Sequence, residues 1–402
     1  MNISNVPAEG KCTGCRACEQ VCSIHAITVD YDEFGFLVPT VSNSCTQCGR
    51  CSAVCQAQSM KPDLFHKIGH CYIAYAKDKK RALHSASGGA FIVIADEFIK
   101  KYKGTVYGCS MDKQFHVVHA GAADKDSLSC FQGSKYVQSD TQNSYQAAEK
   151  ILQEGKHVLY AGTPCQIAGL KMFLKKEWNT LYTIDLICHG VPSQASFKKY
   201  INWLEGISQK RIQSFRFRNR NAFDASGYQI RVKYENGSEF KCPAMDDLYF
   251  RLFSKDLSLN SACYQCKFAQ SERVGDITIG DSAAAGKLGL YRFEPKSSVM
   301  INTQKGKTLW DLVKNKFVCT EIDKTIETER NKPLSSPPIA FENRKAVCRL
   351  MAEGEFDMLQ HEYPPDRNGH FNIHDVAARI PIVIKRPIYY TLASVRRLFS
   401  AR

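Results

Sequence analysis

The chain has 402 residues, of which 44% are hydrophobic and 23% are charged, and it carries 18 cysteines and a formal net charge of +14. These values are ordinary for a soluble globular protein of two or three domains, and the absence of any run of eighteen apolar residues argues against a membrane-spanning helix. Because the N-terminal segment lacks the basic and apolar stretches of a secretory signal, we expect a cytoplasmic protein whose cysteines hold metal as thiolates rather than form disulfides.

The positive charge is unevenly distributed along the chain. Residues 1–60 contain three basic and five acidic side chains, a balance of −2, so that the remainder carries +16. A basic body can attract nucleic acid, an anionic membrane surface, an acidic electron carrier or a phosphorylated substrate. Charge alone does not choose among these partners.

The first 62 residues contain one cysteine pattern twice, C-x2-C-x2-C-x3-C, beginning at Cys12 and again at Cys45. Three cysteines at this spacing surround one 4Fe–4S cluster, and the fourth reaches the other cluster. The proline that usually follows the fourth cysteine is replaced by Ser23 and Gln56. Structural zinc is the alternative, but zinc sites usually pair two C-x2-C units at longer range. The predicted ligand sets are Cys12, Cys15, Cys18 and Cys55 for one cluster, and Cys45, Cys48, Cys51 and Cys22 for the other.

Regular elements are predicted between and after these cysteines. The segment 26–41 alternates and turns at Phe34-Gly35, which indicates a hairpin. Residues 71–78 and 105–111 are expected to be strands, and residues 88–102 have the apolar spacing of a helix.

Two later stretches, 157–174 and 181–205, each run from an apolar strand through a loop into a helix, which indicates neighbouring parallel strands. Residues 214–242 are expected to form antiparallel strands with a turn at Asn236-Gly237, and residues 276–286 a strand followed by a glycine-bearing loop. Past residue 330 the pattern weakens. The predicted fold class is α+β or α/β and multidomain, with a small bacterial-ferredoxin-like domain (1–62) followed by a mixed α/β flavin-binding body in two parts (70–150 and 151–330) and a C-terminal extension (331–402).

Four further cysteines stand in loops that look suited to a site. Cys165 and Cys188 occupy the loops of the two strand–loop–helix units, and Cys263 and Cys266 form a C-x2-C pair. Such loops gather at one edge of a parallel sheet, where ligands tend to bind. We predict that these four cysteines hold a third 4Fe–4S cluster. A zinc site, a redox-active pair at Cys263–Cys266 and four unmetallated thiols are the alternatives.

The motifs GTPCQIAGL, DLICHGVPS, ACYQC with DITIGD, ASGGAF and GSKYVQS occur together in the chain. Together they resemble the coenzyme F-420 hydrogenase/dehydrogenase beta-subunit family over roughly residues 70–330. The resemblance implies an FAD-containing iron–sulfur oxidoreductase that moves electrons between ferredoxin-type clusters and a two-electron partner. In that family the partner is a deazaflavin coenzyme, a chlorophyll derivative or an unknown small molecule, and some members occur beside polysaccharide-biosynthesis genes.

The same resemblance suggests flavin contacts. Ser87, Gly88 and Gly89 precede a predicted helix, whose free amides can receive a pyrophosphate, although an ordinary N-cap and turn is the alternative. His189, beside Cys188, is a candidate catalytic proton donor, or else a histidine hydrogen-bonded within its loop. The predicted cofactor-binding residues are Ser87, Gly88, Gly89, Lys135, Tyr136, Thr163, Pro164, Gln166, Gly280 and Asp281.

We therefore expect an FAD- and 4Fe–4S-dependent oxidoreductase that takes electrons from ferredoxin or another carrier. The alternative is an electron-transfer subunit with no substrate site of its own. No nucleic-acid partner is expected, because no recognition module is present and Arg216, Arg218 and Arg220 alternate with phenylalanines as on a half-buried strand.

The last 27 residues, from Val376 to Arg402, contain six basic and no acidic side chains. Apolar residues recur beyond Pro387 at helical spacing, which predicts a basic amphipathic helix. Peripheral contact with the inner face of a membrane and docking on the body of the protein are the two interpretations of this helix.

Overall fold

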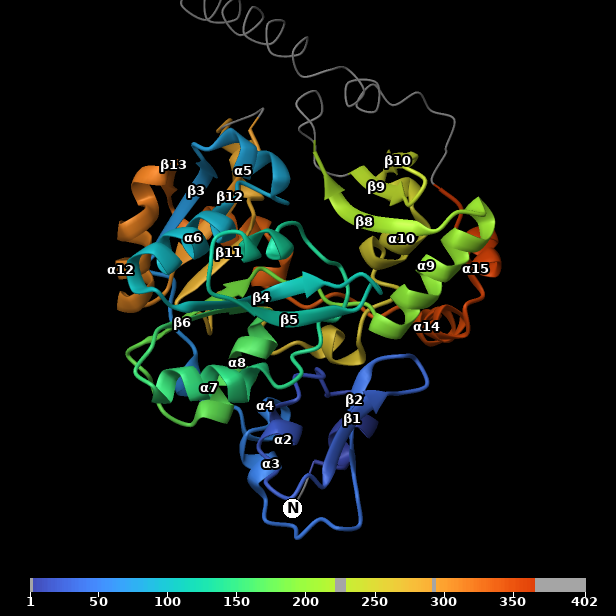
Figure 1. The fold of residues 1–402 in the computed structure, drawn as a ribbon, viewed down its shortest axis with the longest axis horizontal. Helices are drawn as coiled ribbons and strands as arrows, with labels where there is room; N and C mark the ends of the chain where they lie inside the picture. Colours follow the sequence, from blue (N-terminus) through green and yellow to red (C-terminus); the bar gives the residue numbers. More distant parts are fainter. Residues whose placement is uncertain (1–2, 221–228, 291–293, 366–402) are drawn as a thin grey trace, which may run out of the picture.

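The structure is a computed structural model, and it describes residues 3–220, 229–290 and 294–365. Three lobes are visible in Figure 1: an N-terminal lobe at the bottom, a large sheet with its helices, and a smaller sheet with its own helices. The C-terminal segment from Val376 lies outside the described residues. None of the described helices is long and apolar enough to cross a membrane.

The N-terminal lobe is built on the two cysteine repeats. Its hairpin pairs β1 (Ile27–Tyr31) with β2 (Leu37–Val41) in antiparallel register, as the alternation predicted. Around it stand four single-turn helices, α1 (Asn5–Ala8), α2 (Ala17–Gln20), α3 (Arg50–Ala53) and α4 (Gln56–Ser59).

The large sheet has eight strands in the order β13-β3-β12-β11-β7-β6-β4-β5. Strands β11, β7, β6 and β4 run parallel, and antiparallel strands flank them. The two predicted strand–loop–helix units therefore do supply adjacent parallel strands, β6 and β7. The strands in spatial order are β13 (Phe317–Ile322), β3 (His70–Ala76), β12 (Ser297–Ile301), β11 (Ile277–Asp281), β7 (Leu181–Leu186), β6 (Val158–Gly162), β4 (Thr105–Met111) and β5 (Val117–Ala122).

Helices cover both faces of this sheet. On one face α6 (Ala90–Tyr102) and α12 (Gln304–Val313) pack together over a core of aliphatic and aromatic side chains, next to α5 (Lys79–His84). On the other face lie α7 (Ser144–Gln153) and α8 (Pro164–Leu174), between the sheet and the N-terminal lobe. Two further helices, α11 (Ala284–Lys287) and α13 (Lys324–Arg330), pack at the β3 side.

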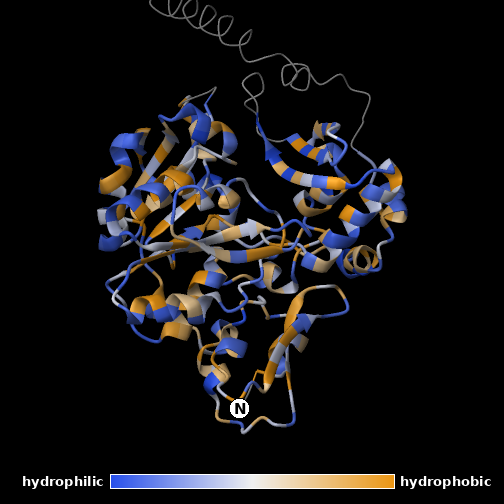
Figure 2. Ribbon diagram, in the orientation of Figure 1, coloured by the Kyte–Doolittle hydropathy of each residue, from blue (hydrophilic) through white to orange (hydrophobic). Residues whose placement is uncertain are grey.

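Helix α8 is buried on almost its whole circumference. Nine of its eleven residues are buried, because the sheet covers one side and α2 and α4 of the N-terminal lobe cover the other. A helix that is apolar all round is typical of such a central position. Figure 2 shows the hydrophobic residues along the inner strands and on α8, with hydrophilic residues on the outer helices.

The third lobe packs the antiparallel sheet β10-β9-β8 against four helices. The turn at Asn236-Gly237 joins β9 to β10 as predicted, and the weakly patterned segment past residue 330 supplies two of the helices. The strands are β8 (Ile212–Asn219), β9 (Gln229–Tyr234) and β10 (Glu239–Pro243), and the helices are α9 (Gln194–Ser208), α10 (Leu248–Ser254), α14 (Arg344–Glu353) and α15 (Phe356–Glu362).

The predicted alternation of β8 is wrong at its end. Phe217 and Arg218 are both buried, at 1% and 5% exposed, so that buried and exposed residues do not alternate there. The pairing of β8 with β9 shifts register between Arg216 and Asn219, and a shift of this kind breaks the two-residue period. Arg218 therefore points into the protein.

Candidate functional site

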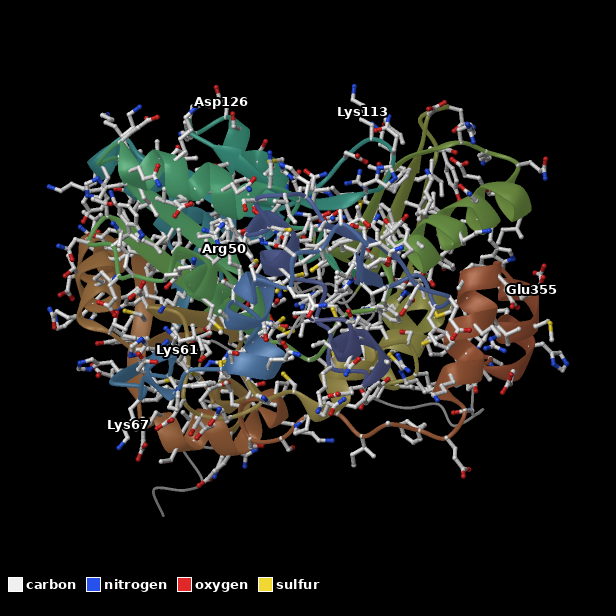
Figure 3. The ribbon with its side chains drawn as sticks, turned by 90° about the horizontal axis from the view of Figure 1, so that it is seen from below. Arg50, Lys61, Lys67, Lys113, Asp126 and Glu355 are labelled. Atoms are coloured by element: carbon white, nitrogen blue, oxygen red, sulfur yellow. The ribbon has the colours of Figure 1, made fainter. Side chains whose placement is uncertain are left out.

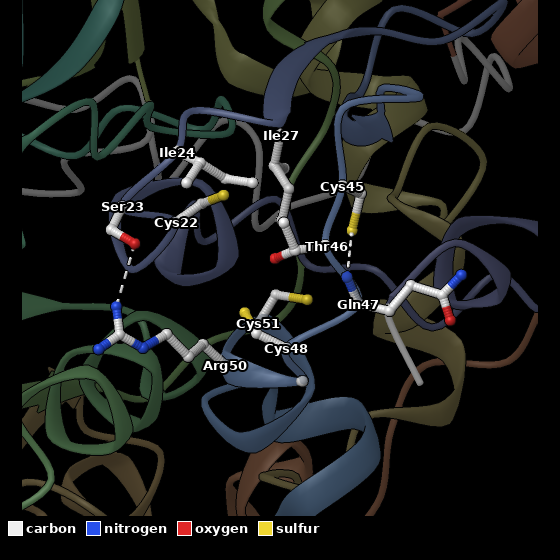
Figure 4. A pocket seen from close by; sticks show the side chains of 11 residues that line it. Cys22, Ser23, Ile24, Ile27, Cys45, Thr46, Gln47, Cys48, Arg50 and Cys51 are labelled. Atoms are coloured by element: carbon white, nitrogen blue, oxygen red, sulfur yellow. Dashed lines mark hydrogen bonds between the residues drawn. The ribbon is translucent and has the colours of Figure 1, made fainter.

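The eight N-terminal cysteines gather in two groups. Each group lines a separate cavity, of about 170 Å³ in one case and about 30 Å³ in the other. Figure 4 shows the thiols around the larger cavity. The larger cavity is lined by Cys22, Cys45, Cys48 and Cys51, and the smaller by Cys12, Cys15, Cys18 and Cys55. The grouping is the one that crossed ligation of two cubanes requires, because each repeat lends its fourth cysteine to the other group.

The two groups differ in their distance from solvent. The outer group, around Cys48, lies at the tip of the lobe, where Cys48 and Arg50 are exposed (Figure 3, seen from below). The inner group, around Cys15, faces the body. Burial raises the pKa of the Cys15 and Cys18 thiols, whereas the amide of Arg50 and its neighbours lower that of the exposed Cys48.

The N-terminal lobe is docked on the body by buried polar side chains. The side-chain oxygen of Gln20 accepts hydrogen bonds from the amides of Tyr145 and Gln146 at the start of α7. Gln138 accepts from the amide of Leu37 and donates to the carbonyl of Thr13. These contacts fix the inner group against the sheet.

The hairpin of the N-terminal lobe is also held at its tip. The hydroxyl of Ser193 donates to the carbonyl of Gly35 at 2.5 Å, and a Cβ at position 35 would lie only 2.6 Å from that hydroxyl. Glycine is required there for this approach and for a φ of +76°. Helix α14 closes the other side through the ion pair between Arg349 and Glu33 at 3.1 Å.

The third predicted set of cysteines is brought together at the carboxyl ends of β6 and β7. Cys165 lies at the start of α8, and Cys188 follows β7. Burial raises the pKa of the Cys165 thiol well above its usual value, and the neighbouring thiols of Cys188, Cys266 and Cys263 raise it further. The pKa of Cys188 is raised to about 12 by burial and then by Cys266. The four thiols, each partly buried, therefore lie close enough together to influence one another.

Local structure explains why these loops can meet. Thr163 and Gln166 form a capping box at the start of α8, with Pro164 in the first turn, and this fixes Cys165. A Cβ on Gly190 would lie 3.3 Å from Cβ of Cys263 and 2.8 Å from Leu259, so that glycine allows the loop after Cys188 to approach the C-x2-C segment.

The spacing of the thiols bears on the kind of metal. Among the described residues, no three His, Cys, Asp or Glu side chains are placed to hold one metal ion. A single zinc ion needs its ligands at one centre, whereas the thiolates of a cubane bind separate irons at its corners and stand further apart. All 18 cysteines are in the described part of the chain, and all are free thiols. The third cluster stays a prediction.

Next to the third set of cysteines lies a buried arginine, Arg273, that was not predicted from the sequence. Arg273 is 1% exposed and lies 3.4 Å from the fully buried carboxylate of Asp185. Its guanidinium donates to the carbonyls of Leu186 and Phe268, which flank the segments of Cys188 and Cys266. Arg273 therefore holds two ligand-bearing segments together and places a positive charge near their thiols.

His189, the candidate proton donor, is paired with a carboxylate. Its Nε2 lies 2.5 Å from Oδ1 of Asp256, although the angles do not suit a hydrogen bond, and its ring meets Phe253 edge-on at 5.2 Å. Asp256 itself adopts a left-handed backbone with φ +58°. The geometry places His189 beside the third set of cysteines, and its catalytic role stays a prediction.

The predicted flavin contacts fall into two kinds. Some are occupied in building the fold: the amide of Gly88 donates to Ser297, and a Cβ there would lie 2.3 Å from the carbonyl of Ala74. Gly89 caps α6 with φ +83°, and a Cβ on Gly280 would lie 2.7 Å from Ile187. Thr163, Pro164 and Gln166 serve the capping of α8 described above.

Lys135 is likewise engaged with the backbone. Its ammonium donates to the carbonyls of Cys109 and Cys130 at 3.0 Å, and burial lowers its pKa. Its neighbour Tyr136 is placed differently, because its hydroxyl accepts a hydrogen bond from Arg218. Arg218 also pairs with Asp281 at 2.7 Å. Tyr136 and Asp281 are thus linked through an arginine, and Lys135 is not part of this group.

Two further cations, Arg220 and Lys296, come together near these residues. Arg220 donates to the carbonyl of Ser87 at 3.1 Å, and Ser87 in turn donates to the carbonyl of Lys296. Burial lowers the pKa of Lys296, and the charge of Arg220 lowers it further. Like charges drawn together in this way, with Arg218 nearby, are typical of a site that receives an anion. The sequence pattern missed Lys296, because no local motif marks it.

Comparison with known proteins bears on this arrangement. Residues 155–325 match the family model for the C terminus of the coenzyme F420 hydrogenase/dehydrogenase beta subunit, and residues 11–59 match a 4Fe-4S dicluster domain. Residues 155–325 thus carry the C-terminal domain of the coenzyme F420 hydrogenase/dehydrogenase beta subunit, and a dicluster domain precedes it. The family assigned from the sequence motifs is confirmed.

All eight cysteines of the first two groups lie inside the dicluster domain, and the third set lies inside the other matched domain. The chain is thus an iron–sulfur, electron-transferring protein of oxidoreductase type. The F420-reducing NiFe hydrogenase complex from Methanosarcina barkeri contains a similar chain, with 16% identity, a TM-score of 0.45, and coverage of 75% of this chain and 93% of that chain. No curated protein matched this chain.

Proposed function

We propose that the protein is an iron–sulfur flavoprotein oxidoreductase that passes electrons from a ferredoxin-type donor, through its 4Fe–4S clusters and FAD, to a two-electron acceptor. The observation that supports this most directly is the gathering of Cys165, Cys188, Cys263 and Cys266 on the inner side of the docked N-terminal lobe. Three groups of four thiols then form one connected series from the exposed tip to the sheet.

The residues present fit the cofactors of this proposal. Each N-terminal group surrounds a cavity, and the partly buried thiols of the third set lie close together. Arg218, Arg220 and Lys296, with Tyr136 and Ser87 beside them, would hold the anionic part of FAD. Bound FAD would supply the conversion between the single electrons of the clusters and the electron pair of an organic acceptor.

The exposed outer group is the proposed docking point for the electron carrier. Cys48 and Ile24 lie at its surface, and Arg50 is the charged side chain of its cavity. The family description makes a deazaflavin coenzyme the first acceptor to test. The second candidate function is an electron-transfer subunit whose partner holds the substrate site, which would reduce an artificial acceptor but no deazaflavin.

The test is anaerobic purification followed by iron and flavin analysis. Three clusters require about twelve irons per chain and two require about eight, at four per cubane. Cys165→Ser combined with Cys263→Ser should lower the count by about four. The matched control is Cys130→Ser combined with Cys319→Ser, two cysteines outside the three groups, and it should keep all the iron.

Either of two results would contradict the proposal. One is a fully loaded wild-type protein with only about eight irons, at four per cubane, and the other is a protein that neither releases flavin on denaturation nor takes it up afterwards. The N-terminal signals in electron paramagnetic resonance should survive in the Cys165/Cys263 variant, which separates loss of one cluster from general unfolding.

A further inference from the structure

Gln56 occupies a place where the sequence departs from the usual dicluster pattern. It directly follows Cys55, a member of the inner group, where proline is the usual residue. The backbone does not require a glutamine there, since position 56 is the first residue of α4, and a first helical position accepts proline readily. The reason for glutamine must therefore lie in its side chain.

The side chain of Gln56 joins the N-terminal lobe to the third set of cysteines. It is 4% exposed, and its Nε2 donates to the carbonyl oxygen of Cys165 at 2.9 Å and to the hydroxyl of Thr13 at 2.8 Å. Its amide also lies beside the thiol of Cys15, whose pKa it lowers against the larger effect of burial. The side-chain amide of Gln56 thus contacts Thr13 and Cys15 in the N-terminal lobe and the backbone of Cys165 in the body.

The equivalent position in the other repeat behaves differently. Ser23 follows Cys22, lies exposed at the tip, and accepts a hydrogen bond from Arg50 of the same lobe. The two repeats therefore carry different residues at the same place, and only the repeat that faces the body reaches across to it.

Helix α8 adds a second contact at the same point. The thiol of Cys15 lies 3.1 Å from where a Cβ on Gly169 would stand. Gly169 is one turn beyond Cys165, about 6 Å along the helix at roughly 1.5 Å per residue. The inner group and the third set are thus separated by little more than one helical turn, and Gln56 spans that separation.

We infer that Gln56 is a positioning residue that fixes the inner cluster against the third cluster and thereby controls electron exchange between them. This rests on the proposed third cluster. In that exchange one electron would leave a reduced inner cluster and reach an oxidised third cluster, with no atom transferred. The side-chain amide of Gln56 fixes the segment that carries Cys55 against the segment that carries Cys165. A serine side chain at position 56 would be too short to do so, and proline has no donor.

The experiment compares Gln56→Met and Gln56→Pro with wild type in the full, anaerobically prepared protein. Methionine keeps the length but not the donor, and proline restores the usual pattern. Gln58→Met is the matched control, because it makes the same change two residues along α4 at a less buried position. The readouts are iron content, the magnetic interaction between the reduced inner and third clusters, and the rate at which the third cluster is reduced after rapid mixing with reductant.

Both Gln56 variants should keep their iron, should show a weaker magnetic interaction and should slow reduction of the third cluster, because electron transfer becomes slower as the two clusters move apart. Gln58→Met should match wild type. Unchanged interaction and rate in a Gln56 variant with a full complement of iron would overturn the inference and leave the proposed function intact. A wild-type protein without a third cluster would overturn both.

Discussion

Both carboxylate oxygens of Asp140 accept hydrogen bonds from the guanidinium of Arg16, at 2.5 Å from Nε and 2.9 Å from Nη2. Arg16 stands between Cys15 and Cys18, and Asp140 belongs to the body, so this largely buried pair joins the two. Arg16→Gln should lower the free energy of unfolding by about 3 kcal/mol, because it leaves a carboxylate buried without its partner. Denaturant unfolding under anaerobic conditions measures this. The double variant with Asp140→Asn should cost less than the sum of the single variants, and simple additivity would show that the pair is not coupled.

Gly169 gives a steric test of the same interface. A Cβ there would lie 3.1 Å from both the thiol of Cys15 and the hydroxyl of Tyr145. Gly169→Val should therefore push the N-terminal lobe away from α8 and release iron from the inner group first. The control is Gly206→Ala in α9, where a Cβ meets nothing within 4 Å and where the change should stabilise the helix by about 0.5–1 kcal/mol. Retention of all iron in Gly169→Val would contradict the close packing.

Asp247 should make stability depend on pH. Burial raises the pKa of this carboxyl from 3.8 to about 6 although it accepts hydrogen bonds from Tyr200 and from the amide of Phe250. A raised folded-state pKa means that its stabilising contribution is complete below about pH 4 and is lost as the pH rises through about 6. Asp247→Asn should therefore stabilise the protein at about pH 8 by up to about 3 kcal/mol, since the shift is about two pKa units.

Denaturant unfolding at about pH 5 and about pH 8, on either side of the raised pKa, provides the measurement for Asp247→Asn. Asp323 is the matched control, because it also caps a helix but its pKa is lowered by hydrogen bonds from Thr325. Asp323→Asn should have the opposite sign and should lose stability at the higher pH. Equal effects of Asp247→Asn at both pH values would show that the carboxyl titrates normally.

Arg273 and Asp185 should shift the reduction potential of the proposed third cluster in opposite directions. Removing a buried positive charge makes added electrons less favourable, so Arg273→Gln should lower the potential, and Asp185→Asn should raise it. A charge at this depth corresponds to a change on the order of 50 mV. Redox titration followed by electron paramagnetic resonance measures this, with the N-terminal clusters as internal references. Shifts of the same sign in both variants would indicate structural disturbance instead of a charge effect.

The third set of cysteines could be predicted from the sequence in part, because a local strand–loop–helix pattern also implies how the strands are arranged in the sheet. Cys165 and Cys188 each follow an apolar strand, and adjacent parallel strands bring such loops together, so their proximity could be anticipated. The pairing of Arg273 with Asp185 could not, because a buried ion pair between distant segments leaves no periodic signal. The inward turn of Arg218 was missed for a similar reason, since the register shift that causes it depends on β9.

The three groups of thiols differ in how their members are distributed along the chain. The two N-terminal groups come from one short lobe, whereas the third draws on α8, the loop after β7 and the segment around Cys263, which are far apart in the chain and meet in the folded body. Iron could therefore be inserted into the N-terminal lobe while later segments are still leaving the ribosome. A cluster at Cys165 could form only after the large sheet has folded. Its iron would therefore be inserted after that of the N-terminal lobe, and the presence of this iron would indicate a correctly folded body.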